Sequence, residues 1–155
     1  MIAIDPARDL RIEQFIKASP ETIWRCWQEP DLFKQWFTPP GVEVTEVVND
    51  VRSGGRAYVV MKLPDGTLMP NEGCFLHAKY PTLLVYGDAV TADWRPGTEP
   101  FMTAIVELLA QDEGTLYRAT VLHNDTAARE KHEGFGFHDG WGTTLRQLAV
   151  LAASL

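Results

Sequence analysis

The chain has 155 residues, a length typical of one domain, and its formal net charge is −7 because 21 acidic side chains outnumber 14 Lys and Arg. This balance, without a basic cluster, argues against a nucleic-acid partner, and no apolar run approaches the roughly 18 residues that cross a bilayer as a helix. Residues 1–6 lack the basic start and apolar stretch of a signal peptide, so we expect a cytoplasmic protein with a single domain over residues 1–155.

The first part of the chain predicts one strand followed by two short helices. Residues 9–17 alternate imperfectly between apolar and polar side chains, as a half-buried strand does. Ser19 and Pro20 form a typical helix start, with Ser19 as the N-cap and Pro20 at the first helical position. Pro30 cannot continue this helix, and we expect Asp31 to cap a second short one.

The middle of the chain is typical of an antiparallel sheet. Its strand-like segments are separated by short turns such as Pro64-Asp65-Gly66, where glycine supplies a positive φ, and Asp112-Glu113-Gly114. The expected strands are residues 42–47, 56–63, 73–78, 83–86, 101–109 and 115–123. Short connections favour antiparallel pairing, because parallel strands need a long crossover.

The last part predicts a long helix over residues 127–154, with Asn124 or Asp125 as its N-cap. Its apolar face is formed by Phe137, Trp141, Leu145, Leu148 and Leu151. Several glycines interrupt this pattern, and we expect close packing or a break near residues 134–136. An antiparallel sheet must bury one face, and only this helix is long enough to cover it, so we expect an α+β fold with a cavity between sheet and helix.

Four segments of the chain carry a family resemblance in their order. They are residues 18–24 with Trp27, Pro30, Trp36, Phe37 and Pro40; residues 52–56 with Met61 and residues 64–66; Gly73 with Pro81, Leu83 and Leu84; and residues 131–133 with 136–141, Leu145 and Leu148. Together they resemble the START-like (SRPBCC) superfamily, in the AHSA-type branch of homologues of the activator of the 90-kDa heat-shock chaperone ATPase.

This resemblance implies a helix-grip (Bet v-like) fold, in which about six to seven curved antiparallel strands surround a long C-terminal helix. It places two short helices after the first strand. It also implies a deep apolar pocket for a lipid, a polyketide or an aromatic molecule.

The candidate ligand-binding residues are Trp36, Phe37, Ala57, Val59, Met61, Phe75, His77, Tyr86, Trp94, Tyr117, His138 and Trp141. Trp36 and Phe37 are expected at the pocket mouth, although core packing is the plainer interpretation of both. The resemblance turns Ala57, Val59 and Met61 inward, where the small Ala57 would widen the pocket.

The polar candidates have ordinary structural alternatives. Phe75 and His77 are expected on one strand face, so His77 is either a pocket residue or a surface histidine. Tyr86 and Trp94 flank a loop over residues 87–100, which could cover one end of the pocket as a lid. His138 lies three residues before Trp141 and is expected on the inward side of the helix, where a backbone partner is an alternative to a ligand.

Metal and cofactor binding are not expected. His132 and His138 are six residues apart, about 240° around a helix, and so do not share a face. Neither Cys26 nor Cys74 has a nearby cysteine companion, and phosphate-binding and nucleophile-elbow motifs are missing from the sequence.

Three functions are compatible with this sequence. The first is a small binding protein for a hydrophobic molecule, without chemistry of its own, in which His77, His123, His138 or Tyr117 would orient the ligand. The second is an enzyme of the polyketide cyclase or hydrolase kind that uses a pocket histidine as general acid or base. The third is a stress-related, chaperone-interacting or otherwise protein-binding domain, with a homodimer through an exposed strand edge as one form.

Overall fold

The computed structural model describes residues 3–155, so Met1 and Ile2, the start of the segment that lacks signal-peptide features, lie outside the described residues. Strand β1 (Leu10–Ile16) leads to helix α1 (Pro20–Gln28). As predicted, Ser19 is the N-cap of α1, and its hydroxyl accepts a hydrogen bond from the backbone N–H of Thr22.

Helix α2 (Pro30–Phe33) begins two residues earlier than predicted. Glu29 occupies the N-cap position and Pro30 the first helical position, so the expectation that Asp31 caps this helix is wrong. The reason is that proline, which cannot continue a helix, is well suited to start one, because its fixed φ is helical and its missing N–H is not needed there. Pro30 therefore ends α1 and begins α2.

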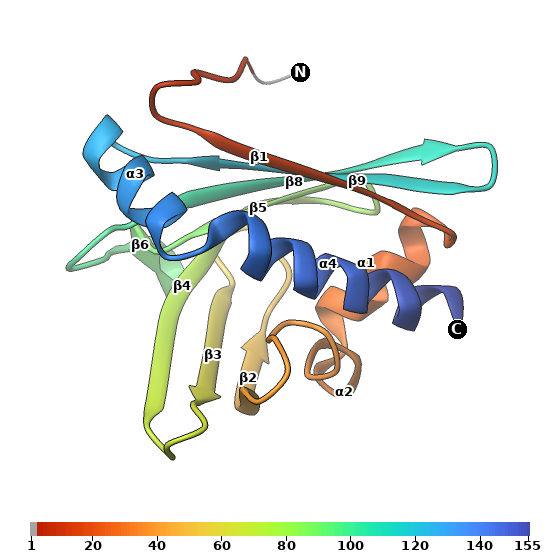
Figure 1. Cartoon of the computed structure of the whole chain (residues 1–155), viewed down its shortest axis with the longest axis horizontal. Helices are drawn as coiled ribbons and strands as arrows, with labels where there is room; N and C mark the ends of the chain where they lie inside the picture. Colours follow the sequence, from red (N-terminus) through yellow and green to blue (C-terminus); the bar gives the residue numbers. More distant parts are fainter. Residues whose placement is uncertain (1–2) are drawn as a thin grey trace.

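A sheet of seven antiparallel strands makes up the middle of the fold (Figure 1). Its order is β1-β9-β8-β5-β4-β3-β2, with β2 (Glu43–Asn49), β3 (Arg56–Lys62), β4 (Leu68–Lys79), β5 (Leu83–Gly87), β8 (Thr103–Gln111) and β9 (Gly114–Leu122). Strand β4 is longer than predicted because its first half pairs with β3 alone. Pro70 lies in that half, where its missing N–H is tolerated.

The expected loop over residues 87–100 contains short elements of its own. They are β6 (Val90–Thr91), a 3₁₀ turn (Ala92–Trp94) and β7 (Arg95–Pro96), and β6 and β7 form a separate two-stranded sheet. This hairpin is anchored at Gly54, whose carbonyl accepts a 3.0 Å hydrogen bond from the backbone N–H of Asp93.

Two helices complete the chain, α3 (Thr126–Gly134) and α4 (Phe137–Ala153). Asp125 caps α3, and the break falls within the predicted segment, at Gly136, where φ is +89°. Helix α4 lies in the hollow of the curled sheet, with α1 and α2 at its C-terminal end (Figure 1). This arrangement confirms the α+β class and the helix-grip fold.

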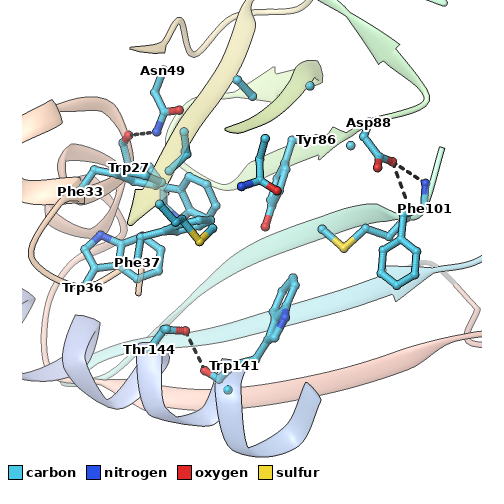
Figure 2. A pocket seen from close by; sticks show the side chains of 18 of the residues that line it. Trp27, Phe33, Trp36, Phe37, Asn49, Tyr86, Asp88, Phe101, Trp141 and Thr144 are labelled. Atoms are coloured by element: carbon cyan, nitrogen blue, oxygen red, sulfur yellow. Dashed lines mark hydrogen bonds between the residues drawn. The ribbon is translucent and has the colours of Figure 1, made fainter. Parts of the chain in front are cut away.

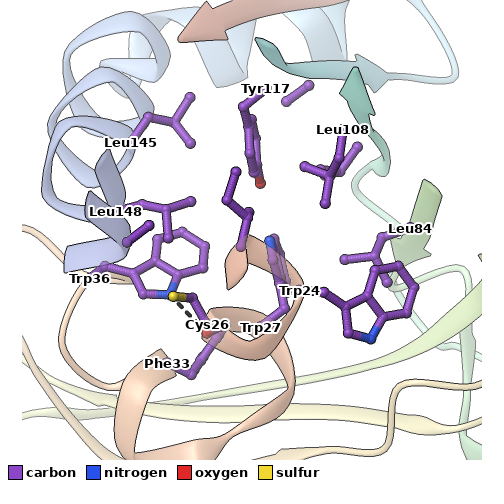
Figure 3. Packing of buried hydrophobic residues seen from close by; sticks show 14 of the residues in the cluster. Trp24, Cys26, Trp27, Phe33, Trp36, Leu84, Leu108, Tyr117, Leu145 and Leu148 are labelled. Atoms are coloured by element: carbon purple, nitrogen blue, oxygen red, sulfur yellow. Dashed lines mark hydrogen bonds between the residues drawn. The ribbon is translucent and has the colours of Figure 1, made fainter. Parts of the chain in front are cut away.

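The core packs between these layers and combines aromatic with aliphatic side chains (Figure 3). Trp27, Phe33 and Trp36 from the α1–α2 segment contact Leu145 and Leu148 of α4 and the inner side of the sheet in one buried cluster. Gln147 of α4 connects the same parts by hydrogen bonds, because its side-chain amide donates to the carbonyls of Trp36 (3.0 Å) and Thr38 (2.8 Å).

Candidate functional site: a cavity between sheet and helix

A cavity of about 390 Å³ lies between the sheet and α4 (Figure 2). It is too large for an ordinary packing defect and lies within the size range of small-molecule sites. Of the predicted residues, its lining includes Trp36, Phe37, Ala57, Val59, Met61, Phe75, Tyr86, Tyr117 and Trp141. The wall of the cavity is therefore formed by the segment from α1 to the residues just after α2, by strands β3, β4, β5 and β9, and by helix α4.

The inner end of the cavity is formed by packed aromatic rings around Trp27. The Trp27 ring lies 5.2 Å from that of Tyr86 and 5.3 Å from that of Trp36, measured between centroids. Phe33 and Phe37 stack at 4.3 Å beside them. Trp27 follows Ile23 by four residues on α1, so both side chains lie on the same, buried side of the helix. Trp27 was not among the candidate ligand-binding residues, although it lines the cavity.

Two hydroxyls and one indole provide polarity at this end without charge. Tyr117 points toward the indole of Trp27 (Figure 3), whose buried Nε1 makes no hydrogen bond with any other described residue. Burial raises the pKa of Tyr117 well above its usual range, and the Trp27 indole offsets this only in part. Burial also raises the pKa of Tyr86. Both phenols therefore remain neutral at physiological pH.

The polar side chains at the rim are mostly engaged with the protein itself. Asn49 donates to the carbonyl of Trp27 at 3.0 Å, and Asp88 accepts from the backbone N–H groups of Phe101 (2.8 Å) and Met102 (3.1 Å) (Figure 2). Glu72 forms an ion pair with Arg56 in which Nη2 and Oε1 are 2.7 Å apart. Neither Lys nor Arg is among the described residues that line the cavity.

A buried pair of histidines lies at the side of the cavity away from Trp27, and one of the two forms part of the wall. Nε2 of His123 lies 2.9 Å from Nδ1 of His132, and Nδ1 of His123 lies 2.8 Å from the carbonyl oxygen of Arg8. Burial, and secondarily the nearby His123, lower the pKa of His132 to about 4. Of the two, His132 lines the cavity.

Three of the predicted residues do not line the cavity, and His77 is the first of them. The pairing of β4 with β5 shifts between Phe75 and His77, which leaves Leu76 as an extra residue in a β-bulge. The bulge interrupts the alternation, so Phe75 is buried whereas His77 is exposed. The expectation that these two side chains share a face is therefore wrong.

Trp94 and His138 are also placed elsewhere. Trp94 is 53% exposed, and its indole lies against the backbone of Gly54. The middle of the β6–β7 hairpin thus packs on the β2–β3 turn, and of the predicted lid only the first two residues, Gly87 and Asp88, line the cavity. His138 is exposed in the first turn of α4, where it pairs at 3.1 Å with Glu133 of α3.

The sequence also missed residues that do line the cavity, among them Trp27, Asn49, Asp88, Phe101, Met102 and His132. Phe101 and Met102 lie just before β8, and because alternation places consecutive residues on opposite faces, it could not assign both to the cavity. The position of His132 could not be predicted because the break at Gly136 sets α3 at its own angle to α4. The direction of its side chain therefore does not follow from the period of one continuous helix.

Within residues 3–155, we find no cluster of three or more His, Cys, Asp or Glu side chains with the geometry of a metal site. In the same range no helix combines the length and the apolarity required to span a membrane.

A curled antiparallel sheet closed over a long C-terminal helix, with an apolar cavity between them, defines a protein of the helix-grip class, consistent with the START-like superfamily. The family described as "Activator of Hsp90 ATPase homolog 1-like protein" matches residues 17–153. The chain therefore belongs to this family.

Solved structures agree with this assignment. A crystal structure of a protein from Nitrosomonas europaea is 38% identical, with 96% of each chain covered and a TM-score of 0.92. Two more distant crystal structures support the fold. The Rhodobacter sphaeroides protein is 22% identical over 100% of this chain and 99% of the other, with a TM-score of 0.84. The AHSA1 protein of Silicibacter pomeroyi is 24% identical over 92% and 95%, with a TM-score of 0.66. A comparison with curated proteins gave no match.

Proposed function

We propose that this protein binds a neutral, largely apolar small molecule of the lipid, polyketide or aromatic class in the cavity between the sheet and α4. The observation that carries the proposal is a cavity of about 390 Å³ whose inner end is walled by aromatic rings. Burying roughly 300 Å² of apolar ligand surface would contribute ~7 kcal/mol, from which the cost of association is subtracted. We therefore expect dissociation constants in the micromolar range or weaker.

The charges around the cavity favour a neutral ligand. Its described lining contains the carboxylates of Glu72 and Asp88 and lacks Lys and Arg, and the chain as a whole has a formal charge of −7. A ligand carboxylate or phosphate would lose hydration without gaining a cationic partner. Within the lipid class, we therefore expect alcohols and other uncharged molecules to bind better than fatty-acid anions.

The test is a titration with N-phenyl-1-naphthylamine, a neutral aromatic probe whose fluorescence rises in apolar surroundings. Ala57→Trp places a large side chain in the cavity and should abolish the rise. Tyr58→Trp adds an indole on the opposite face of the same strand and should leave the rise intact, because Tyr58 lies outside the cavity lining. Equal binding by both variants would mean that the probe binds elsewhere, and absence of binding by the unmodified protein would refute the proposal.

The two other functions have less support. His77 and His138 are exposed and outside the lining, so neither can serve as the pocket histidine that the cyclase or hydrolase hypothesis needs. Association with a chaperone, a stress-related role and a homodimer through a strand edge stay predictions, to be tested by co-purification and by the molar mass in solution.

A further inference from the structure

We propose that His132 presents a bare Nε2 to the cavity as a hydrogen-bond acceptor and thereby selects ligands that carry a hydroxyl or N–H donor at that end. This inference rests on the proposed function, and it specifies the head group of the molecule that the cavity holds.

The tautomers of the two histidines follow from their partners. A carbonyl oxygen can only accept, so Nδ1 of His123, 2.8 Å from the Arg8 oxygen, carries a hydrogen. A neutral His123 then has a bare Nε2, which accepts from Nδ1 of His132 at 2.9 Å. Nδ1 of His132 therefore carries the single N–H hydrogen of that neutral side chain, and its Nε2 is bare.

The bare nitrogen has no partner within the described part of the protein. His132 is 9% exposed, it lines the cavity, and only its Nδ1 forms a hydrogen bond with another described residue. The ring is held in place by aromatic neighbours, with the centroids of Phe101 and Phe137 at 4.9 and 5.1 Å. A fixed acceptor beside an apolar space is the kind of polar group that orients a ligand.

The same geometry excludes other head groups. An ether oxygen or a carboxylate would face Nε2 acceptor to acceptor, and the tautomer cannot reverse without breaking the hydrogen bond to His123. An alcohol or a phenol donates to Nε2 and keeps both existing bonds. One neutral hydrogen bond corresponds to a preference of about three- to tenfold in affinity.

The experiment compares 2-naphthol with 2-methoxynaphthalene, which share a ring system and differ in the donor. Both displace N-phenyl-1-naphthylamine from the full chain at pH 7.5, and the readout is the ratio of their dissociation constants. His132→Asn retains an amide N–H where Nδ1 was but removes Nε2, so the ratio should move about three- to tenfold in favour of the ether. His132→Gln, whose carbonyl can replace Nε2, should restore part of the preference for naphthol.

His138→Asn is the matched control, because it changes an exposed histidine that lies outside the cavity lining and should leave the ratio unchanged. An unchanged ratio in His132→Asn would overturn the inference while the proposed function stands. Failure of the probe itself to bind would refute both.

An NMR measurement on the unmodified protein tests the tautomer directly, without a bound ligand. Long-range ¹H–¹⁵N spectra of the imidazole rings distinguish a hydrogen on Nδ1 from one on Nε2, and the spectrum of His132→Asn assigns the signals. We expect the Nδ1–H form for both His123 and His132. An Nε2–H form of His132 would overturn the inference.

Discussion

The indole Nε1–H of Trp36 donates a 2.9 Å hydrogen bond to the carbonyl of Cys26, inside α1 (Figure 3). In a regular helix this carbonyl would accept from the residue four positions later, but that residue is Pro30, which has no N–H. Trp36 thus satisfies a buried carbonyl that the proline deprives of its usual partner, and at the same time forms the inner wall of the cavity.

The first prediction concerns this bond. Trp36→Phe should lower the free energy of unfolding by about 2–4 kcal/mol, because it removes apolar contacts and leaves the Cys26 carbonyl unsatisfied. Trp24→Phe is the control, since Trp24 is equally buried but its indole makes no hydrogen bond with the described residues. Urea denaturation measures both. Equal losses in the two variants would show that the hydrogen bond contributes nothing.

A second prediction follows from His132, whose pKa is lowered to about 4 from an ordinary value of 6.5. Between these values the unfolded chain binds a proton that the folded protein does not, so stability falls as the pH decreases from 6.5 toward 4. Below about 4 the folded protein is protonated too, and this loss stops growing. We expect His132 to account for a loss of roughly 2 kcal/mol between pH 7 and pH 4.5.

The measurement is urea denaturation at several pH values, with His132→Gln beside His77→Gln, because His77 is exposed and forms no ion pair with a described carboxylate. The glutamine at position 132 should flatten the profile over this window, whereas the one at 77 should leave it close to that of the unmodified protein. Because neither substitution removes an ion pair of a described carboxylate, the titration of the carboxylates cancels in the comparison. Parallel profiles for the unmodified protein and His132→Gln would contradict the prediction.

The secondary structure could be predicted largely from local patterns. Which side chains face the cavity could not be predicted for every residue. Ser19 and Pro20 start α1 through local geometry, which does not depend on the rest of the fold. Alternation identified most strands without knowledge of their partners. The first half of β4 was missed because Pro70 interrupts its pattern, although pairing with β3 on one side suffices to hold it. His132 could not be placed because its orientation depends on the turn at Gly136.

The contact between Trp94 and Gly54 leads to a third prediction. Gly54 has φ +86°, and a Cβ built there would lie 2.8 Å from Nε1 of Trp94. Gly54→Ala should therefore cost about 1 kcal/mol from the backbone conformation and about 1 kcal/mol more from the indole. In a Trp94→Ala background only the first part should remain. Additive costs in this double-mutant cycle would show that the indole does not press on Gly54.

The cysteines provide a fourth prediction. Burial raises the pKa of the Cys26 thiol to about 11 and that of Cys74 as well, and both side chains are fully buried. Because the thiolate is the reactive form, neither should react with a disulfide reagent at pH 8 until the chain opens. Labelling should be negligible in buffer and should rise together with urea unfolding. Rapid labelling of one cysteine in buffer would reveal local opening around it.

The two hydrogen bonds from Gln147 to the segment after α2 have a consequence for the kinetics of binding. They connect α4 to the backbone carbonyls of Trp36 and Thr38 at the aromatic end of the cavity. This end of the wall is therefore held in place and is not the route by which a ligand enters. Two exposed residues of the lining, Asn71 and Glu72 of β4, lie away from these bonds, whereas the third, Pro39, directly follows the bonded Thr38. A ligand therefore exchanges between β4 and α4, and substitutions at Asn71 or Glu72 should change association and dissociation rates together while leaving the equilibrium affinity nearly unaltered.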